Sequence, residues 1–356
     1  MKSLSTCSLF VLALAVALTG CAKNQDGTGS GTGGGPSNRA VVTGSAKPRI
    51  GYVTNGVASF WVIAEAGAKQ AGQEVDADVE VLMPAEGISD QKRMLEDLLT
   101  KGVDGIAVSP IDPENQTELL NKAAKYAKLI TQDSDAPDSN RLCYVGVDNY
   151  TAGRMCGELV LEAMRDGGKL AIFVGRMEQD NARGRRQGMI DKILGRSEDP
   201  SRFDPPDAEI KEGKWHIVGT YTDQFDRAQG KANAEDAMSR HPDLAGMVGL
   251  FAYNPPLMLE ALKQGDKLGK IKVIGFDEAD ETLQGIKDGT VYGTVVQNPF
   301  EYGRQSVTIL AGLARGKTLI ELGVPEDGFV NIPARQIRQD NVDEFWAELK
   351  KNVGEQ

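Results

Sequence analysis

The stretch IGYVTNGVASFWVIAEAGAKQAGQEVDADVEVLM (residues 50–83) shows the pattern that decides the fold. A run rich in β-forming residues at 50–54 is followed by a helical pattern at 60–72 and by a second such run at 79–83. Two strands joined by a helix of this length form a βαβ unit, in which the strands lie parallel in one sheet. This segment alone therefore predicts an α/β fold.

The same alternation continues to about residue 315. Because ten strands exceed one comfortable sheet, we predict two Rossmann-like lobes, each a parallel sheet flanked by helices. Beyond the first unit, strands are expected at 105–109, 129–133, 143–148, 169–175, 215–221, 246–252, 272–277 and 293–297, and helices at 89–101, 114–127, 151–165, 181–195, 226–240, 256–264, 280–288 and 299–315.

The composition argues against several classes of protein. The chain has 356 residues, which suggests about two domains, and 40 Lys and Arg against 51 Asp and Glu give a formal net charge of −11. A nucleic-acid-binding protein needs a surplus of basic residues, so we expect no nucleic-acid partner. Two histidines and four cysteines leave little material for a metal or haem site. Common hydrolase, zinc-protease and phosphate-loop motifs are absent from the sequence, and we expect no enzymatic activity, cofactor or metal.

The N-terminus is predicted to be an export signal. Lys2 precedes the apolar run LFVLALAVAL (9–18), which is about half as long as a helix that spans a bilayer. The tetrapeptide LTGC (18–21) resembles the bacterial lipobox, which implies a lipoprotein signal peptide at 1–20 and lipidation of Cys21. A plain secretory signal followed by a chance cysteine is the alternative. The lipobox implies a lipid anchor to a membrane, facing the periplasm or the cell exterior.

A flexible tether is expected after the signal. Residues 21–47 are rich in Gly, Ser and Thr, and Val41 and Val42 are their only adjacent apolar β-formers. Such a segment cannot bury enough apolar surface to fold. A flexible chain of this length has a typical reach of about 28 Å, so it would tie the folded body loosely to the membrane.

Two cysteines remain in the predicted folded body. Cys143 opens a predicted strand, and Cys156 lies about two turns into the following helix. Cα atoms more than about 7 Å apart cannot form a disulfide without backbone movement. We expect two buried thiols, with a disulfide as the alternative.

Polar residues recur at the carboxyl ends of the predicted strands, in both halves of the chain. A single Asp after a strand is usually a helix cap, whereas ligands of parallel sheets bind at the carboxyl ends of the strands. The recurrence favours a shared cleft over a series of independent caps. The residues concerned are Asn55, Asp133, Asp148, Asn254, Asp277 and Gln297.

Over nearly all of residues 48–335, the chain resembles the type I periplasmic substrate-binding proteins of the ribose-binding group. The order of several segments carries this resemblance: IGYVTNGVASFW, LITQDSD, NARGRRQG (181–188), FDRAQGKANAEDAM, HPDLAGMVGLFAYN, VIGFDEAD and GTVVQNPFEYG. Ser134 stands where this family often has Arg, and Ala58 and Ser59 stand where it often has Asn. These departures leave the particular sugar open.

The resemblance implies a set of ligand-binding residues whose chemistry suits a polyol. Aromatic rings can cover the CH-rich faces of a sugar, and planar polar groups can bond its hydroxyls in pairs. In NARGRRQG the resemblance implies Arg183, with Arg185 and Arg186 expected in solvent. The implied set is Asn55, Phe60, Trp61, Asp133, Arg183, Phe225, Asn254, Asp277 and Gln297.

The family further implies two lobes joined by a three-strand hinge. Crossings near 148–151, 297–300 and 330–334 would divide the chain into an N-terminal lobe (48–148 plus 299–331) and a C-terminal lobe (149–298 plus 332–350). A monomer of this kind would close on a monosaccharide or similar polyol and deliver it to a membrane ABC permease. The alternative is a sensor of a sugar or furanone that hands its closed form to a chemoreceptor or a kinase.

Overall fold

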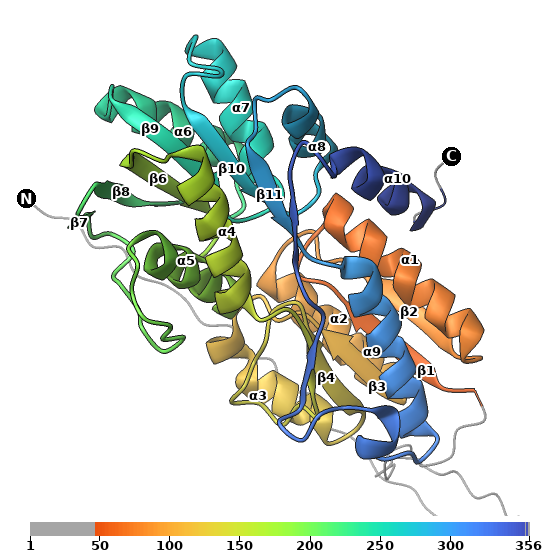
Figure 1. Ribbon diagram of the computed structural model, residues 1–356. Coiled ribbons are helices and arrows are strands. Elements are labelled where there is room, and N and C mark those ends of the chain that lie inside the picture. The colour runs from red at the N-terminus through yellow and green to blue at the C-terminus, as the bar shows by residue number, and fades with distance from the viewer. Residues whose placement is uncertain (1–46, 353, 355–356) are drawn as a thin grey trace, which may run out of the picture. The chain divides into compact units, whose positions relative to one another are not determined.

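The computed structural model describes residues 47–352 and 354, in which strands and helices alternate along most of the chain (Figure 1). The predicted signal peptide (1–20), the lipidation site Cys21 and the tether up to residue 46 lie outside the described residues. All ten predicted strands and all nine predicted helices are present, with ends within about three residues of those expected.

The first sheet has six parallel strands in the order β12-β5-β4-β3-β1-β2. Its strands are β1 (Arg49–Val53), β2 (Asp78–Leu82), β3 (Gly105–Val108), β4 (Lys128–Gln132), β5 (Tyr144–Gly146) and β12 (Phe329–Asn331). Helices α1 (Ser59–Glu74) and α9 (Pro299–Ala314) lie side by side on one face, and α2 (Ile88–Lys101) and α3 (Pro113–Ala124) also pack on this sheet (Figure 1).

The second sheet has seven strands in the order β13-β11-β10-β9-β6-β8-β7, of which only β7 and β13 are antiparallel to their neighbours. Its strands are β6 (Gly168–Val174), β7 (Ile210–Glu212), β8 (Trp215–Thr222), β9 (Leu244–Gly249), β10 (Lys272–Phe276), β11 (Gly293–Val296) and β13 (Arg335–Ile337). Its helices are α4 (Asn149–Ala163), α5 (Asp180–Ile193), α6 (Arg227–Arg240), α7 (Asn254–Gln264) and α8 (Asp280–Lys287). Two largely parallel sheets flanked by helices confirm the predicted α/β fold.

The described chain passes between the two sheets three times, as the hinge prediction requires. The links run from β5 to α4, from β11 to α9 and from β12 to β13. The two links that enter helices end in caps, because the side chains of Asp148 and Asn298 accept hydrogen bonds from Thr151 N and Glu301 N. All three connections are short, which suits a hinge between two lobes.

Besides the three-residue 3-10 helix η1 (Ile320–Leu322), four short or terminal elements were not predicted. Strands β7, β12 and β13 have three residues each, and the edge strands β7 and β13 hold few apolar residues. Such strands give too short an alternation for a pattern to be recognised. The fourth is α10 (Val342–Asn352), an amphipathic helix with Asp343 and Glu344 in its first turn and Lys350 and Lys351 in its last. It packs against α8 and α1.

The interior of the described chain is apolar and tightly packed. The strands near the middle of each sheet are buried on both faces, as expected for sheets covered by helices. Cys143 and Cys156 are buried free thiols, which confirms the expectation. Within residues 47–352, no helix is both long enough and apolar enough to cross a lipid bilayer.

Glycines let α4 and α5 approach closely. A Cβ atom at Gly153 would lie 2.2 Å from the carbonyl oxygen of Arg185, and one at Gly188 would lie 2.0 Å from that of Tyr150. These distances are far below van der Waals contact, and the obstructing atoms are backbone, so they cannot move aside cheaply. The packing therefore fixes the position of α5 and of the side chains it carries.

We expect Gly188→Ala to lower the free energy of unfolding by about 1–3 kcal/mol, because the added methyl group must push the two helices apart. Urea unfolding followed by circular dichroism measures this effect. Gly56→Ala is the matched control, because a Cβ there would meet nothing within 4 Å, and its effect should stay within about 0.5 kcal/mol. Equal effects of the two substitutions would contradict the close packing.

Candidate functional site

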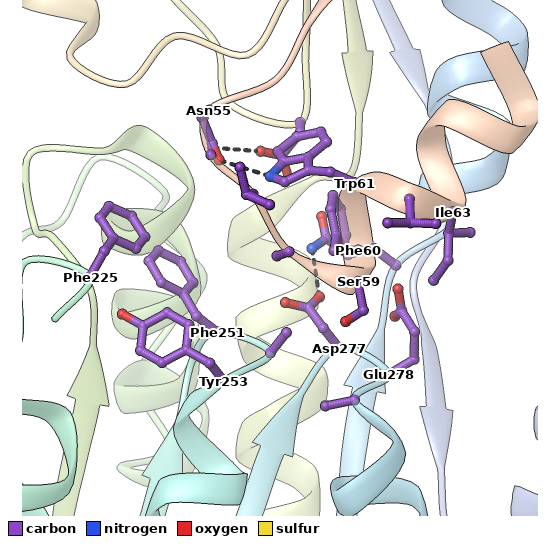
Figure 2. A pocket seen from close by; sticks show the side chains of 18 of the residues that line it. Asn55, Ser59, Phe60, Trp61, Ile63, Phe225, Phe251, Tyr253, Asp277 and Glu278 are labelled. Carbon is purple, nitrogen blue, oxygen red and sulfur yellow. Dashed lines mark hydrogen bonds between the residues drawn. The ribbon is translucent and has the colours of Figure 1, made fainter. Parts of the chain in front are cut away.

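One cavity of about 930 Å³ lies at the carboxyl ends of strands from both sheets. Its volume is typical of small-molecule sites, which fall in the range of about 300–1,000 Å³. Seven of the nine predicted ligand-binding residues line it: Asn55, Phe60, Trp61, Asp133, Phe225, Asp277 and Gln297 (Figure 2 labels five of them). The structure therefore brings together residues separated by more than 200 positions in the sequence.

The two strand-end aspartates are held by the same device, one in each sheet. Asp133 follows β4 with a φ of 60°, and Asp277 follows β10 with a φ of 65°. Each backbone N–H donates to a carbonyl of the neighbouring strand, over 3.0 and 2.8 Å respectively. The carbonyl oxygen of each aspartate accepts a hydrogen bond from a side-chain hydroxyl of the same neighbouring strand. The donor is Tyr144 Oη over 2.8 Å for Asp133, and Thr294 Oγ1 over 2.9 Å for Asp277. These bonds hold a left-handed backbone conformation that is costly for non-glycine residues.

Strained backbone is concentrated at the cavity. Of the six non-glycine residues in the described chain with a positive φ, four line it. Besides the two aspartates these are Gln224 and Phe225, with φ values of 54° and 66°. Such conformations cost about 1–3 kcal/mol each and persist where the surroundings enforce them, which is characteristic of ligand sites.

The Asp133 carboxylate belongs to a hydrogen-bond network with residues of the first sheet. Its Oδ2 accepts from Ser109 Oγ over 2.9 Å and from Asn55 Nδ2 over 3.3 Å. Asn55 Oδ1 in turn accepts from Trp61 Nε1 over 3.1 Å. Burial raises the pKa of Asp133 to about 6, against the opposing effects of the Arg185 charge and the Ser109 hydrogen bond. The network fixes three predicted residues, and Asp133 Oδ1 remains available to a ligand.

The Asp277 carboxylate is oriented by an amide and faces a guanidinium. Its Oδ1 accepts from Gln297 Nε2 over 2.7 Å, and Gln297 Oε1 accepts from Tyr302 Oη over 3.0 Å. Arg185 Nη1 lies 3.8 Å from Asp277 Oδ2. Burial raises the pKa of Asp277, and the Arg185 charge opposes this shift. The arrangement presents acceptors and donors side by side, as neighbouring hydroxyls of a polyol require.

Aromatic side chains form two groups on the cavity wall, shown apart from each other in Figure 2. Phe60 and Trp61 meet edge to face, with centroids 4.8 Å apart. In the other group Phe225 stacks on Phe251 with centroids 5.8 Å apart, and Tyr253 lies beside them. Aromatic rings on both sides of a polar cavity suit a ligand with CH-rich faces.

The expectation for the arginines of NARGRRQG is wrong. Arg183 does not line the cavity: its side chain is 41% exposed, and its Nε donates to Met177 O over 2.8 Å. Arg185 and Arg186, expected in solvent, are both buried, and Arg185 lines the cavity. Arg186 instead donates to Thr220 Oγ1 and to loop carbonyls. Two positions along a helix turn the side chain by about 200°, so Arg183 and Arg185 face opposite ways.

Asn254 is also displaced from its predicted role. It is buried but does not line the cavity. Its Oδ1 accepts from Phe251 N over 3.0 Å, and its Nδ2 donates to Asp223 Oδ2 over 3.2 Å. Asn254 therefore shapes the loop before α7, and the preceding Tyr253 reaches the wall in its place.

Several further residues of the cavity wall were not predicted from the sequence. The spacing of Asn181 and Arg185, one turn apart on α5, is the signal that could have identified that face. Phe251 and Tyr253 lie in the turn between β9 and α7, where no regular pattern marks them. The missed residues of the wall include Arg176, Gln179, Asn181, Arg185, Phe251, Tyr253 and Glu278.

Buried polar atoms without partners gather on this wall. In the described part of the chain, thirteen buried side-chain nitrogen and oxygen atoms have no hydrogen-bond partner, and seven of them belong to residues that line the cavity. Buried polar groups are normally satisfied, because an unmade bond costs about 1–3 kcal/mol. The atoms are Arg176 Nε, both terminal atoms of Gln179, Asn181 Oδ1, Arg185 Nη2 and both Oε atoms of Glu278.

Comparison with known proteins agrees with this geometry. The family model described as "Periplasmic binding protein domain" matches residues 50–318. The chain belongs to this family. Its members are binding proteins rather than enzymes, in agreement with the expectation from the sequence, and the resemblance to the ribose-binding group is confirmed.

Individual members of the family are similar over most of their length. The ribose import binding protein RbsB of Haemophilus influenzae is 24% identical over 75% of this chain and 85% of its own. The D-ribose/D-allose-binding protein of Pseudomonas aeruginosa is 26% identical over 82% of this chain and 89% of its own. An ABC transporter solute-binding protein of Burkholderia graminis, solved with D-arabinose, is 26% identical with a TM-score of 0.73, covering 83% of this chain and 97% of its own.

Proposed function

We propose that this periplasmic binding protein captures a monosaccharide or similar polyol in the cavity and delivers it to a membrane ABC permease. The observation that carries the proposal is the concentration of unpartnered buried polar atoms on a wall that also bears aromatic rings. A polyol can satisfy both features of the wall, because its hydroxyls can form hydrogen bonds with the polar atoms and its CH groups can pack against the rings.

The relatives support both parts of this proposal. The names of the compared proteins specify ribose, allose and arabinose, and the B. graminis protein is a component of an ABC transporter. The cavity is lined from both sheets, and the chain passes between the sheets three times. A ligand that bonds to both lobes would favour the closed state, and that state would present its surface to the permease.

We further propose that the protein is exported and works as a monomer tied to a membrane by lipid on Cys21. The apolar run at 9–18 and the LTGC tetrapeptide support the export and the lipid anchor. Metabolic labelling of the expressing cells with a fatty acid analogue tests it: the wild type should carry the label, and Cys21→Ala should not. Label on the Cys21→Ala protein would contradict lipidation at this residue.

Thermal unfolding of the full chain with a panel of pentoses, hexoses and polyols tests the sugar-binding proposal. A ligand at 100 times its dissociation constant adds about 2.7 kcal/mol to the unfolding free energy, which raises Tm by about 4 °C or more for a folded body of this size. Asp277→Asn should abolish the shift, because the carboxylate loses its charge at the centre of the polar wall. Asp97→Asn, at an exposed position on α2, should keep it. A folded wild type with no shift across the panel would contradict the proposal.

A further inference from the structure

Glu278 is a buried carboxylate on the cavity wall that the surrounding protein leaves unsatisfied. Glu278 is only 5% exposed, and neither of its Oε atoms has a hydrogen-bond partner. It lines the cavity next to Asp277, and Figure 2 places its carboxylate near Ser59 and Ile63 of α1. An isolated carboxylate out of water is so costly that it either takes up a proton or finds a positive partner.

The charges around Glu278 do not supply that partner. Asp277 beside it is negative, and Arg185 of α5 already faces Asp277. Arg335 of β13 forms an ion pair of 3.0 Å with Glu348 of α10, and the first turn of α1 carries no charged residue. Burial and then the Asp277 charge raise the pKa of Glu278 well above its ordinary value, against the attraction of the two arginines.

The buried part of the wall has more carboxyl groups than cationic groups. Asp133, Asp277 and Glu278 are three buried carboxylates, and Arg185 is the one buried guanidinium among the described wall residues. The half-buried Arg176 lies over the ring of Phe225, and Figure 2 shows this ring on the opposite side of the cavity from Glu278. Asp133 and Asp277 accept hydrogen bonds from protein side chains. Glu278 alone of the three carboxylates accepts none.

We propose that Glu278 receives a protonated amino group of the ligand, so that the preferred ligand is an amino sugar. This inference rests on the proposed function, that the cavity binds a sugar. An ammonium group provides the missing positive charge and up to three donors, enough to satisfy both Oε atoms with charge-assisted bonds. The remaining polar residues of the wall are then left for hydroxyl groups.

The test is calorimetric titration of the full chain at pH 7 with D-glucosamine, D-galactosamine and D-mannosamine. Each is compared with its neutral parent hexose and with its N-acetyl derivative, which keeps the nitrogen but not the charge. We expect at least one amino sugar to bind about ten-fold or more tightly than both of its uncharged counterparts, because a buried charge pair forms only with the amine.

Two variants then assign the preference to a residue. Glu278→Gln keeps the size of the side chain and removes its charge, so it should reduce the affinity for the amino sugar about ten-fold more than the affinity for the parent hexose. Glu281→Gln is the matched control, because Glu281 is an exposed carboxylate at the same cavity, and it should keep the preference.

The outcomes separate this inference from the proposed function. If neutral hexoses bind the wild type as tightly as their amines, or if Glu278→Gln keeps the preference, the inference is overturned and sugar binding stands. If the folded wild type binds no sugar of any kind, both are overturned. The ratio of affinities in the wild type decides the question even if Glu278→Gln does not fold.

Discussion

Replacing Arg185 with Met should abolish binding of the sugar identified in the panel, whereas Arg183→Met should leave its affinity within about two-fold of the wild type. Arg185 Nε donates to Asn149 Oδ1 and Nη1 to Leu250 O, each over 3.0 Å, which aims the guanidinium at the cavity. Its Nη2 has no partner in the described chain and is free to donate to a ligand. Arg183 lies outside the cavity, in contact with Glu114.

The stabilities of these variants should differ as clearly as their affinities. Removing Arg185 leaves buried carboxylates without their opposing charge, a change that costs about 3–5 kcal/mol. Loss of its ligand contacts should weaken binding by about 100-fold or more. Urea unfolding and calorimetry of the two Met variants measure both quantities. Lost binding in Arg183→Met together with normal binding in Arg185→Met would contradict the placement of α5.

Arg183 and Arg185 show a feature of the site that the sequence alone does not predict, namely which side of a helix faces the cavity. The segment 181–188 was correctly predicted to begin a helix at the cavity, but the side of the helix that faces the ligand depends on its rotation by fractions of a turn. That rotation is set by packing, through Gly153 and Gly188, and not by the local pattern. Two arginines only two positions apart therefore differ in burial, Arg183 being exposed and Arg185 buried.

The strands that carry the site were predictable because their patterns are strong. Buried strands such as β3 and β11 read as continuous β-forming runs, and their carboxyl ends must meet at one edge of a sheet. Asp133, Asp277 and Gln297 follow directly from that rule. Phe251 and Glu278 do not, because an aromatic residue or an acid near a strand end is equally compatible with core packing or solvent.

The left-handed backbone at Asp133 and Asp277 also lay beyond the sequence. Asp tolerates this conformation better than most residues but does not require it. Its cause is tertiary: hydroxyl groups of Tyr144 and Thr294, on neighbouring strands, bond the two carbonyls. Only the folded arrangement reveals that the two sheets hold their aspartates in the same way.

Acidification should weaken sugar binding while stabilising the free protein, and Asp133 should cause much of both effects. The pKa of this buried carboxyl is raised to about 6. If the ligand needs the ionised form as an acceptor, lowering the pH from 7.5 to 5 leaves about one tenth of Asp133 ionised and reduces the affinity about ten-fold. Calorimetric titration at the two pH values measures this change. Asp133→Asn should bind more weakly at pH 7.5 and with less dependence on pH.

The stability of the free protein should change with pH in the opposite sense. A carboxyl whose pKa is higher in the folded than in the unfolded state contributes stability that is present below the unfolded value, about 3.9, and lost as the pH rises through about 6. Asp133→Asn removes this loss, so we expect the variant to be more stable than the wild type by about 1–3 kcal/mol at pH 7.5, with a much smaller difference at pH 4.5. Urea unfolding without ligand at both pH values measures the difference. If the wild type is the more stable protein at pH 7.5, ionisation of the buried Asp133 does not lower the stability of the free protein. The strained backbone at this strand end would then need an explanation other than ligand binding.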